Sequence, residues 1–533
     1  MKKLLSVLLV ALLILSALPL AGLAEEEPIH FSLFAKTDVN DYPWEQSYLF
    51  QKMEKMFNVK FDITEINSTV WSEKVGVALT TDSYPDFFLS SDVDTAVYGP
   101  QGVFLDLRNL INEETMPNLY AMYQKYPVAQ KAAMSYDGHQ YAILGYDRTN
   151  TREYLRSRFF VNTQWIRNLG MEEPETLDDM YEILKAFKEQ DADLDGNTDN
   201  EIPMGGSFEY DPYSLLTLPL TAYGYCLAYP AKGTGIFVDI DEEGKVYFVP
   251  TAEHFGDALA WMKKLYDEEL LDPEYFTQAK EQVNAKQSQG IVGAFMDWAQ
   301  WIDIKDEALY SQYDGIEPLT TDVNSEKMWP ADDFKSIGFF AVTDHCKNVE
   351  KLLEVMDWAF TFDAYCTLLG GAEMGSEPGW ENMGYTIEYL DESYGENALQ
   401  LIYTYPDKYA NDTDFREAEC SPGWGTIPLA RVEFTFVESS PTEQALSSAL
   451  NDNYTPYMKV GWPTSAKFAD AESSRLALLA TDIESYLKQM VMKYITGEES
   501  LDNIGLLEEG LKARGLDEYL EIYQTAYDRY INN

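Results

Sequence analysis

Carboxylate side chains recur at short, regular intervals between Asp191 and Pro203, where the chain reads Asp-Ala-Asp-Leu-Asp-Gly-Asn-Thr-Asp-Asn-Glu-Ile-Pro. Aspartates stand at the first, third, fifth and ninth positions, with Gly196 sixth and Asn197 seventh. This spacing lets a short loop surround a hard divalent cation with oxygen ligands, and the glycine permits the sharp turn. Without a cation, so many like charges would repel one another. The stretch predicts a calcium loop; the alternative is an acidic surface loop in an acidic protein.

Motifs of common catalytic sites do not occur elsewhere in the sequence. There is no Gly-x-Ser-x-Gly elbow, no His-Glu-x-x-His, no P-loop and no dinucleotide-binding glycine pattern. The four histidines are far apart and the four cysteines contain no Cys-x-x-Cys, so neither set has zinc spacing. Three full disulfide pairings remain open, but no spacing indicates one, and we expect small core residues. The cysteines are Cys226, Cys346, Cys366 and Cys420.

The first hundred residues of the mature chain alternate strand and helix patterns. Strands are predicted at Ile29–Ala35, Val59–Ile63 and Pro85–Leu89, and helices at Tyr48–Met56 and Trp71–Thr80. This order predicts a mainly parallel sheet, in which ligands bind beyond the carboxyl ends of the strands. Here those ends are Ala35–Trp44 and Ser90–Tyr98.

A second group of elements positions the acidic stretch. Thr176 to Asp179 has the form of a capping box, and the apolar face that follows predicts a helix ending near Gln190. A cation bound directly after this helix would complement its negative C-terminal end. A strand is predicted at Ile291–Met296, and periodicity makes Arg475–Tyr530 almost wholly helical.

Length and charge narrow the class of protein. The chain has 533 residues, which is too many for one hydrophobic core, so two or more lobes are expected. Acidic residues outnumber basic ones by 90 to 39, giving a formal charge of −51. Such a surface repels nucleic acid and anionic membranes and makes a polyanionic ligand less favourable.

Residues 1–24 have the pattern of a secretory signal. Two lysines precede the apolar run Leu4–Ala17, and Ala21–Ala24 forms a small-residue cleavage site. We therefore expect a mature chain that starts near Glu25 and works outside the cytoplasm, secreted or associated with the cell surface. A lipoprotein signal would place a cysteine where Leu23 stands, which puts a lipid anchor in doubt.

Short stretches matching one known family recur in order along nearly the whole mature chain. They include Tyr84–Phe88, Gly99–Leu107, Asp137–Gly138, Phe160–Asn162, Thr176–Asp178, Leu184–Lys188, Asp272–Glu274, Ile495–Glu498 and Tyr527–Tyr530. In these stretches the chain resembles the large extracellular carbohydrate-binding subunits of ABC importers, the solute-binding proteins. The resemblance implies an α/β, periplasmic-binding-protein-like fold of two lobes, with mainly parallel sheets flanked by helices and a helical C-terminal segment.

In this family each lobe is assembled from discontinuous segments. We expect an N-terminal lobe from residues 25–158 and 291–362, and a C-terminal lobe from residues 159–290 and 363–533. Large members carry a structural calcium loop after the corresponding helix, and the present loop matches it through Asp199. Asn200 is then interposed, so either Asn200 or Glu201 completes the site, and Glu201 is favoured for its charge. The expected ligands are Asp191, Asp193, Asp195, Asn197, Asp199 and Glu201.

Sugar ligands need aromatic platforms beside carboxylate, amide or arginine hydrogen-bonding groups. Candidates are residues that follow predicted strands, lie near the crossing between lobes, or occupy a loop that family members often place in the cleft. Trp298 is favoured because Asp297 and Trp301 flank it at a strand exit, although core packing is the usual role of any single aromatic. The candidates are Asp41, Trp44, Tyr98, Arg148, Asp297, Trp298, Trp301, Glu377 and Trp380.

The resemblance implies a monomeric binding protein and not an enzyme. Two lobes would close around an oligosaccharide, and the closed form would be recognised by the membrane permease of an ABC importer. The alternative is a secreted glycoside hydrolase or lyase acting on a polysaccharide, which would need two carboxylates flanking a sugar. With 90 acidic residues, composition cannot support that alternative.

Overall fold

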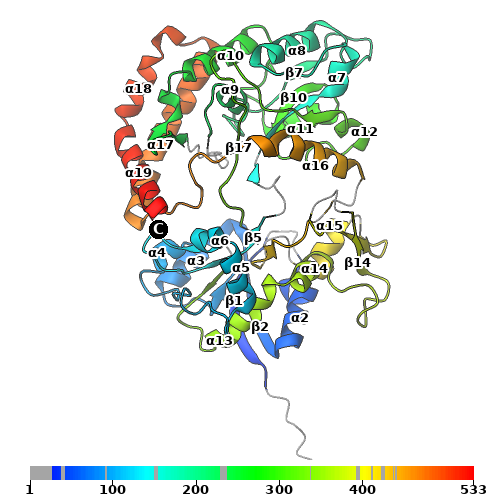
Figure 1. The fold of residues 1–533 in the computed structure, drawn as a ribbon, viewed down its shortest axis with the longest axis vertical. Coiled ribbons are helices and arrows are strands. Elements are labelled where there is room, and N and C mark those ends of the chain that lie inside the picture. Colours follow the sequence, from blue (N-terminus) through cyan, green and yellow to red (C-terminus); the bar gives the residue numbers. More distant parts are fainter. Residues whose placement is uncertain are drawn as a thin grey trace, which may run out of the picture.

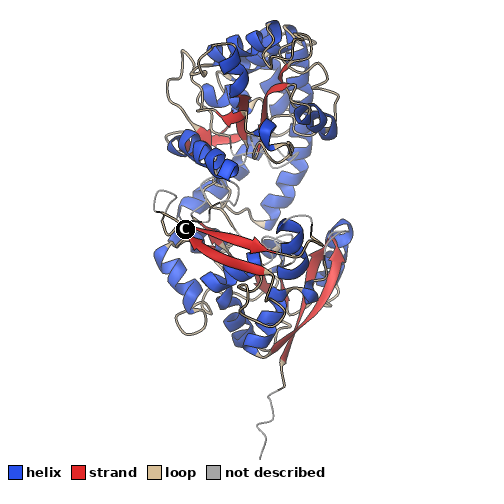
Figure 2. Ribbon diagram, turned by 90° about the vertical axis from the view of Figure 1, so that its right-hand side faces the viewer, coloured by secondary structure: helices blue, strands red, loops and turns tan. Residues whose placement is uncertain are grey.

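Two lobes lie one above the other in both views of the computed structural model (Figures 1 and 2). The predicted signal at residues 1–24 lies outside the described residues. The structure describes residues 27–532 except positions 38–41, 90–92, 149–153, 156, 228–236, 337, 392–395, 410–411, 422–426, 436 and 438–440.

The first lobe is built on a five-stranded sheet of order β2-β1-β3-β13-β4. Parallel pairing joins β1 to β2 and to β3, whereas β13 runs antiparallel to β3 and β4. Phe31, Leu33 and Ala35 alternate as buried residues along β1, as a half-buried strand requires. The strands are β1 (Ile29–Thr37), β2 (Val59–Asn67), β3 (Phe87–Phe88), β4 (Ile143–Leu144) and β13 (Phe339–Val342).

Helices and small two-stranded sheets complete the first lobe. Its core includes Leu49 and Phe50 of α2 and Leu352 and Leu353 of α13, which are buried with β1 and β3. The helices are α2 (Tyr48–Phe57), α3 (Trp71–Thr80), α4 (Thr95–Tyr98), α5 (Pro117–Lys125), α6 (Pro127–Ala133), α13 (Val349–Asp357), α14 (Phe362–Gly370) and α15 (Asp412–Phe415). The paired strands are β5 (Tyr146–Asp147) with β16 (Ala430–Arg431), and β14 (Gly384–Tyr389) with β15 (Leu399–Thr404).

The second lobe is built on a four-stranded sheet of order β11-β6-β10-β7. Only β10 and β7 are parallel, because β6 runs antiparallel to both β10 and β11. The strands are β6 (Arg158–Asn162), β7 (Ile202–Met204), β10 (Val292–Asp297) and β11 (Tyr313–Gly315). Two further pairs are β8 (Val238–Ile240) with β9 (Val246–Phe248), and β12 (Trp329–Pro330) with β17 (Met458–Lys459).

Amphipathic helices cover this sheet. In α8 the predicted capping box is present, since Thr176 accepts from the amide of Asp179 while Asp179 accepts from the Thr176 amide. The C-terminal helices pack on the same core, which contains Leu487 of α17 and Tyr519 of α19. The helices are α7 (Thr163–Asn168), α8 (Leu177–Glu189), α9 (Thr217–Ala222), α10 (Phe255–Asp267), α11 (Lys280–Ser288), α12 (Glu307–Tyr310), α16 (Pro441–Tyr454), α17 (Asp470–Thr496), α18 (Gly505–Lys512) and α19 (Leu516–Asn532).

The chain crosses between the lobes three times: from β5 to β6, from β12 to β13, and from β16 to α16. At the first and third crossings β5 and β16 lie side by side, joined by a buried ion pair between Asp147 and Arg431. Arg431 also donates to the Tyr365 hydroxyl over 3.4 Å. Each charge is 5% exposed or less, so either one alone would be costly to bury.

The two-lobed α/β architecture is confirmed, but two details differ from prediction. The sheets contain more antiparallel pairs than predicted, because β13 and β6 enter them in reverse. The lobes also divide the chain differently: β10 and β11, expected in the first lobe, pair with β6 in the second. Residues of α14 and β15, expected in the second lobe, pack in the core of the first.

Candidate functional site

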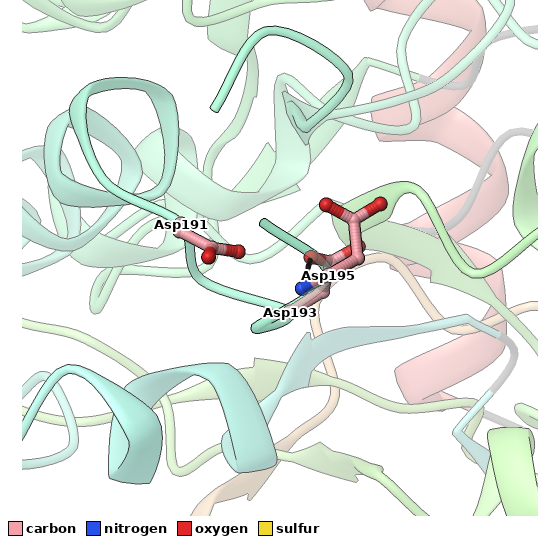
Figure 3. A group of neighbouring side chains, drawn as sticks. All are labelled: Asp191, Asp193 and Asp195. Atoms are coloured by element: carbon pink, nitrogen blue, oxygen red, sulfur yellow. Dashed lines mark hydrogen bonds between the residues drawn. The ribbon is translucent and has the colours of Figure 1, made fainter. Parts of the chain in front are cut away.

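The acidic loop connects the end of α8 to the start of β7 and gathers its carboxylates in one turn (Figure 3). One oxygen from each of Asp191, Asp193 and Asp195 lies within 4.8 Å of the other two. The loop curls because successive amides donate back to its own side chains: Gly196 to Asp191 over 3.1 Å and Asn197 to Asp195 over 2.7 Å. Gly196 has φ of +89°, a conformation that glycine adopts without strain.

Three oxygens of this loop are buried acceptors that lack a hydrogen bond within the described part of the chain. They are Asp191 Oδ1, Asn200 Oδ1 and Glu201 Oε2. Buried acceptors of this kind are costly unless a proton or a cation satisfies them. Burial, followed by the neighbouring charges of Asp193 and Asp191, raises the pKa of Glu201 above its ordinary value. Carboxylate and amide oxygens converging on one point form the donor set that Ca²⁺ prefers.

A cavity of about 310 Å³ lies at the opposite end of β7. The loop enters β7 at Ile202, and the strand leaves into Gly205 and Gly206, which line the cavity. Because β10 runs parallel to β7, the carboxyl end of β10 reaches the same edge of the sheet and brings Asp297 and Trp298 to it. The antiparallel β6 begins at this edge with Arg158, directly after the first crossing, so the cavity adjoins the connection between the lobes. We call it the carboxylate pocket.

Three aspartates, Asp211, Asp297 and Asp303, and one lysine, Lys280, form the charged part of the carboxylate pocket. Lys280, at the start of α11, lies 3.2 Å from Asp303, which also accepts from Asn284 over 2.9 Å. Asp297 accepts a hydrogen bond from the amide of Trp298 over 2.6 Å. Burial, with a smaller contribution from nearby Asp303, raises the pKa of Asp297 to about 7. The pocket therefore holds one carboxyl group that can change its charge near neutral pH.

Aromatic and amide groups provide the rest of the wall. The Arg158 guanidinium lies 5.5 Å from the ring centre of Trp298 and also donates to the Trp298 carbonyl. Tyr210 lines the pocket with Lys280 at 5.2 Å from its ring centre. Gln287 is 2% exposed, and its Oε1 lacks a hydrogen bond among the described residues. An aromatic surface, carboxyl groups and an unsatisfied amide oxygen together suit a ligand with C–H faces and several hydroxyl donors.

The structure places the other predicted ligand residues elsewhere. Trp44 and Trp380, at 5% and 7% exposure, are buried in packed clusters of the first lobe, Trp44 against Phe50 and Trp380 against Tyr48. A ring that is buried in the core cannot stack on a sugar. The binding role predicted for Trp44 and Trp380 is therefore wrong, and both side chains pack in the core. Glu377 forms an ion pair with Lys55 of α2, at a distance of 3.2 Å.

Three further candidates, Arg148, Tyr98 and Trp301, also lie apart from the carboxylate pocket. The Arg148 guanidinium forms an ion pair with Glu396 at 3.2 Å and lies over the ring of Tyr126. Tyr98 packs half-buried on the core of the first lobe, and Trp301 packs on that of the second. Asp41 lies outside the described residues.

Several residues of the carboxylate pocket were not predicted as site residues. Tyr210 comes from a loop far from Trp298 in sequence, whereas Lys280, Asn284 and Gln287 come from α11, the helix directly before β10. The Gly205–Gly206 pair directly after a short strand was the one signal that could have pointed to this edge.

Within the described part of the chain, no helix is both long and apolar enough to cross a membrane. All four cysteines are buried and free. This agrees with the prediction of small core residues and leaves none of the open disulfide pairings formed.

Known proteins similar to this chain include extracellular binding proteins of bacteria. The fructooligosaccharide ABC transporter substrate-binding protein FusA of Streptococcus pneumoniae serotype 4 is 22% identical over 505 residues, covering 92% of this chain and 88% of FusA. The polygalacturonan/rhamnogalacturonan-binding protein YtcQ of Bacillus subtilis (strain 168) is 22% identical over 489 residues, covering 90% and 87%.

Solved structures have the same fold. An HMO-binding solute-binding protein associated with an ABC transporter of Bifidobacterium longum infantis superposes with a TM-score of 0.78 at 20% identity, covering 94% of this chain and 99% of that one. An EF-hand mutant of S. pneumoniae FusA in complex with fructo-nystose gives a TM-score of 0.68 at 20% identity, covering 95% and 100%. The model of the family described as bacterial extracellular solute-binding protein matches residues 49–362, more than half of the chain. The chain therefore belongs to the bacterial extracellular solute-binding proteins.

Proposed function

We propose that this protein binds a neutral oligosaccharide outside the cell and delivers it to the membrane permease of an ABC importer. The observation that carries the proposal is the carboxylate pocket, where Trp298 stands beside Asp297 at a sheet edge next to the lobe crossing. Support comes from relatives whose names describe oligosaccharide and polysaccharide binding. In this proposal one end of the sugar occupies the pocket, and the lobes close over the remainder as a monomer.

Trp298 would act as the platform for a sugar ring, with its indole against a C–H face. Asp297 and the free oxygen of Gln287 would accept hydroxyl protons, while Lys280 and Asn284 hold Asp303 in place. The ligand's hydroxyl groups would then satisfy acceptors that are otherwise buried without a partner, which favours binding of a polyol over an apolar molecule.

A thermal-shift screen over neutral oligosaccharides, followed by calorimetry, tests this proposal. We expect Trp298→Ala to weaken the binding of the best ligand at least tenfold, because stacking on an aromatic ring contributes about 0.5–1.5 kcal/mol beyond area burial. Trp301→Ala is the matched control: its indole packs on the second-lobe core, so affinity per folded molecule should stay the same. Equal affinity for the Trp298 variant and the unchanged protein would refute the assignment.

A glycoside hydrolase is the competing function, because the pocket holds three carboxyl groups, those of Asp211, Asp297 and Asp303, and the pKa of Asp297 is raised. The spacing of Asp297 and Asp303 argues against these two as the catalytic pair. Retaining and inverting enzymes need carboxyl groups about 5–5.5 or 6.5–9.5 Å apart, whereas Asp303 is close enough to Asp297 to contribute a hydrogen bond. Release of reducing sugar during incubation with the best ligand, lost in Asp297→Asn, would establish the enzyme instead.

The acidic loop would hold a structural Ca²⁺ ion. Asp191, Asp193 and Asp195 supply the converging oxygens. The unsatisfied oxygens of Asn200 and Glu201 are both candidates for the last ligand. A solved structure of FusA, a relative, is described as an EF-hand mutant. An ion bound in the present loop would reduce the repulsion between its carboxylates and brace the entry to β7.

Chelation separates a structural ion from a ligand-binding one. We expect EDTA to lower the melting temperature by several degrees while affinity per folded molecule changes less than threefold. Full recovery with Ca²⁺ and none with Na⁺ is the control. If EDTA instead leaves the melting temperature unchanged and abolishes sugar binding, the cation belongs to the sugar site.

A further inference from the structure

A second and larger cavity, of about 620 Å³, lies between the lobes. Its floor comes from the first lobe at α6 and Tyr136, and its roof from the second lobe at residues 465–467 and α19; Figure 1 shows α19 above α6. None of its residues belongs to the carboxylate pocket. We call it the basic cavity.

The charge of this lining is opposite to that of the chain. Four of the residues that line the cavity are cationic and none is acidic, although acidic residues outnumber basic ones 90 to 39 overall. Arg108 and Lys131 come from the first lobe, and Lys467 and Arg529 from the second. Like charges gathered from two lobes repel one another unless an anion lies between them.

Among the described residues, a carboxylate pairs with one of the four cations that line the cavity. Glu472 lies 2.6 Å from Arg529 and also accepts from the amide of Ala469 over 2.7 Å. Asp333 accepts from neutral donors, the Thr464 hydroxyl at 3.0 Å and the Tyr530 hydroxyl at 3.2 Å.

Lys131 and Lys467 are the two lysines of this lining. Within the described residues neither ammonium group has a hydrogen bond or ion pair, and Lys131 Nζ lies over the Tyr530 ring at 4.3 Å. Burial lowers the pKa of Lys467, and the Asp333 charge opposes this only in part. The Ser135 hydroxyl, which also lines the cavity, is buried without a partner among the described residues.

The remaining walls are mainly apolar or aromatic, with Gln130 and Ser465 as further polar residues. Val128, Met134 and Ala526 line the space, and Tyr136 and Tyr530 add two rings, each with a cation from the opposite lobe against its face. A bare inorganic ion would leave this surface uncovered. We propose that the basic cavity is a second ligand site, which binds a small organic oxyanion: a carboxylate or phosphate group carried on an apolar or ring-shaped body.

In this site Lys467 and Lys131 would bind the oxyanion from opposite lobes, with the Ser135 hydroxyl as a neutral donor. Charge-assisted hydrogen bonds are the strongest that these side chains make. Because each lobe contributes cations, the ligand removes a repulsion between the lobes and favours the arrangement in which they lie together.

Calorimetry with glucuronate, phenyl phosphate and inorganic phosphate, at 20 and 200 mM NaCl, tests the proposal. We expect glucuronate or phenyl phosphate to bind more tightly than inorganic phosphate, with affinity falling several-fold at the higher salt. Whichever of glucuronate and phenyl phosphate binds more tightly shows whether the site prefers a carboxylate or a phosphate group. The absence of binding by either at 20 mM NaCl would overturn the proposal.

Variants locate the binding. The double substitution Lys131→Met with Lys467→Met should reduce affinity at least tenfold; methionine keeps the length of each side chain, and removing a buried charge should not prevent folding. Arg108→Gln, at an exposed position, should reduce it several-fold, and Lys74→Met on α3 should leave it unchanged. Unchanged affinity in the double variant would refute the site.

Trp298→Ala distinguishes this site from the sugar pocket. It should leave oxyanion binding intact, so that loss of sugar binding and loss of oxyanion binding are independent results. If Trp298→Ala abolishes oxyanion binding, the anion occupies the carboxylate pocket and the second site does not exist.

Discussion

Replacing Asp297 by asparagine should make the protein more stable at pH 8 but not at pH 4.5. The pKa of this carboxyl group is raised from 3.8 to about 7 by burial and by Asp303. The folded state therefore binds more protons than the unfolded state between these two values, and the unfolding free energy falls as pH rises through that window. Asparagine carries no charge, so the unfolding free energy of the variant does not fall through this pH window.

The size of the effect follows from the pKa shift. About three pKa units correspond to roughly 4 kcal/mol at 1.36 kcal/mol per unit, which is an upper limit. Asp297 is only partly buried by surface area and its pocket admits water, so we expect about half, roughly 2 kcal/mol. For a chain of 533 residues that corresponds to a rise in melting temperature of roughly 2 °C at pH 8.

Melting curves of both proteins from pH 4.5 to 8.5, at one calcium concentration, measure the difference. Other titrating groups are common to both proteins and cancel. Asp303→Asn is the informative companion: it removes the neighbouring charge that raises the pKa of Asp297, and it leaves Lys280 unpaired. The fall in its unfolding free energy that Asp297 causes should therefore end at a lower pH. A difference between Asp297→Asn and the unchanged protein that stays flat across the range would refute the reasoning.

Three further changes test other parts of the molecule. Affinity for the neutral sugar should rise between pH 6 and 8 as Asp297 ionises and becomes a stronger acceptor, and titration calorimetry of the asparagine variant should lose this dependence. Asp195→Ala should lower the melting temperature in calcium by several degrees, whereas Glu243→Ala, an exposed carboxylate in the β8–β9 turn, should not. Asp147→Asn should destabilise the protein by about 3–5 kcal/mol in urea, because Arg431 stays buried without its partner, while Arg148→Ala, at an exposed ion pair, should cost about 1 kcal/mol or less.

Local patterns predicted the elements well. The alternation in Phe31, Leu33 and Ala35, and the capping box at Thr176, depend on residues near one another in sequence, and both appear as predicted. The division into lobes depends on which strand pairs with which over hundreds of residues. The apolar run of β10 would suit either sheet, and only its pairing with β6 assigns it to the second lobe.

The sequence predicted the site correctly where residues suited to sugar binding directly follow a strand. Asp297 and Trp298 follow β10 directly, and the parallel neighbour β7 brings the cavity to them. Trp44 also follows a predicted strand, but its side chain turns into the core. Aromatic residues serve cores and ligands equally well, so sequence position alone cannot separate the two. Lys280 and Gln287 reach the pocket through the packing of α11, which no local pattern encodes.

The three crossings have a consequence for the order of folding during synthesis. The core of the second lobe contains residues of β6 and also of α17 and α19, so its last parts leave the ribosome after everything else has been made. The first lobe likewise cannot be completed until β13 and β16 have been synthesised. The first lobe can therefore complete its core only after β16 has been made, and the second lobe only after α19, the last helix of the chain, has been made.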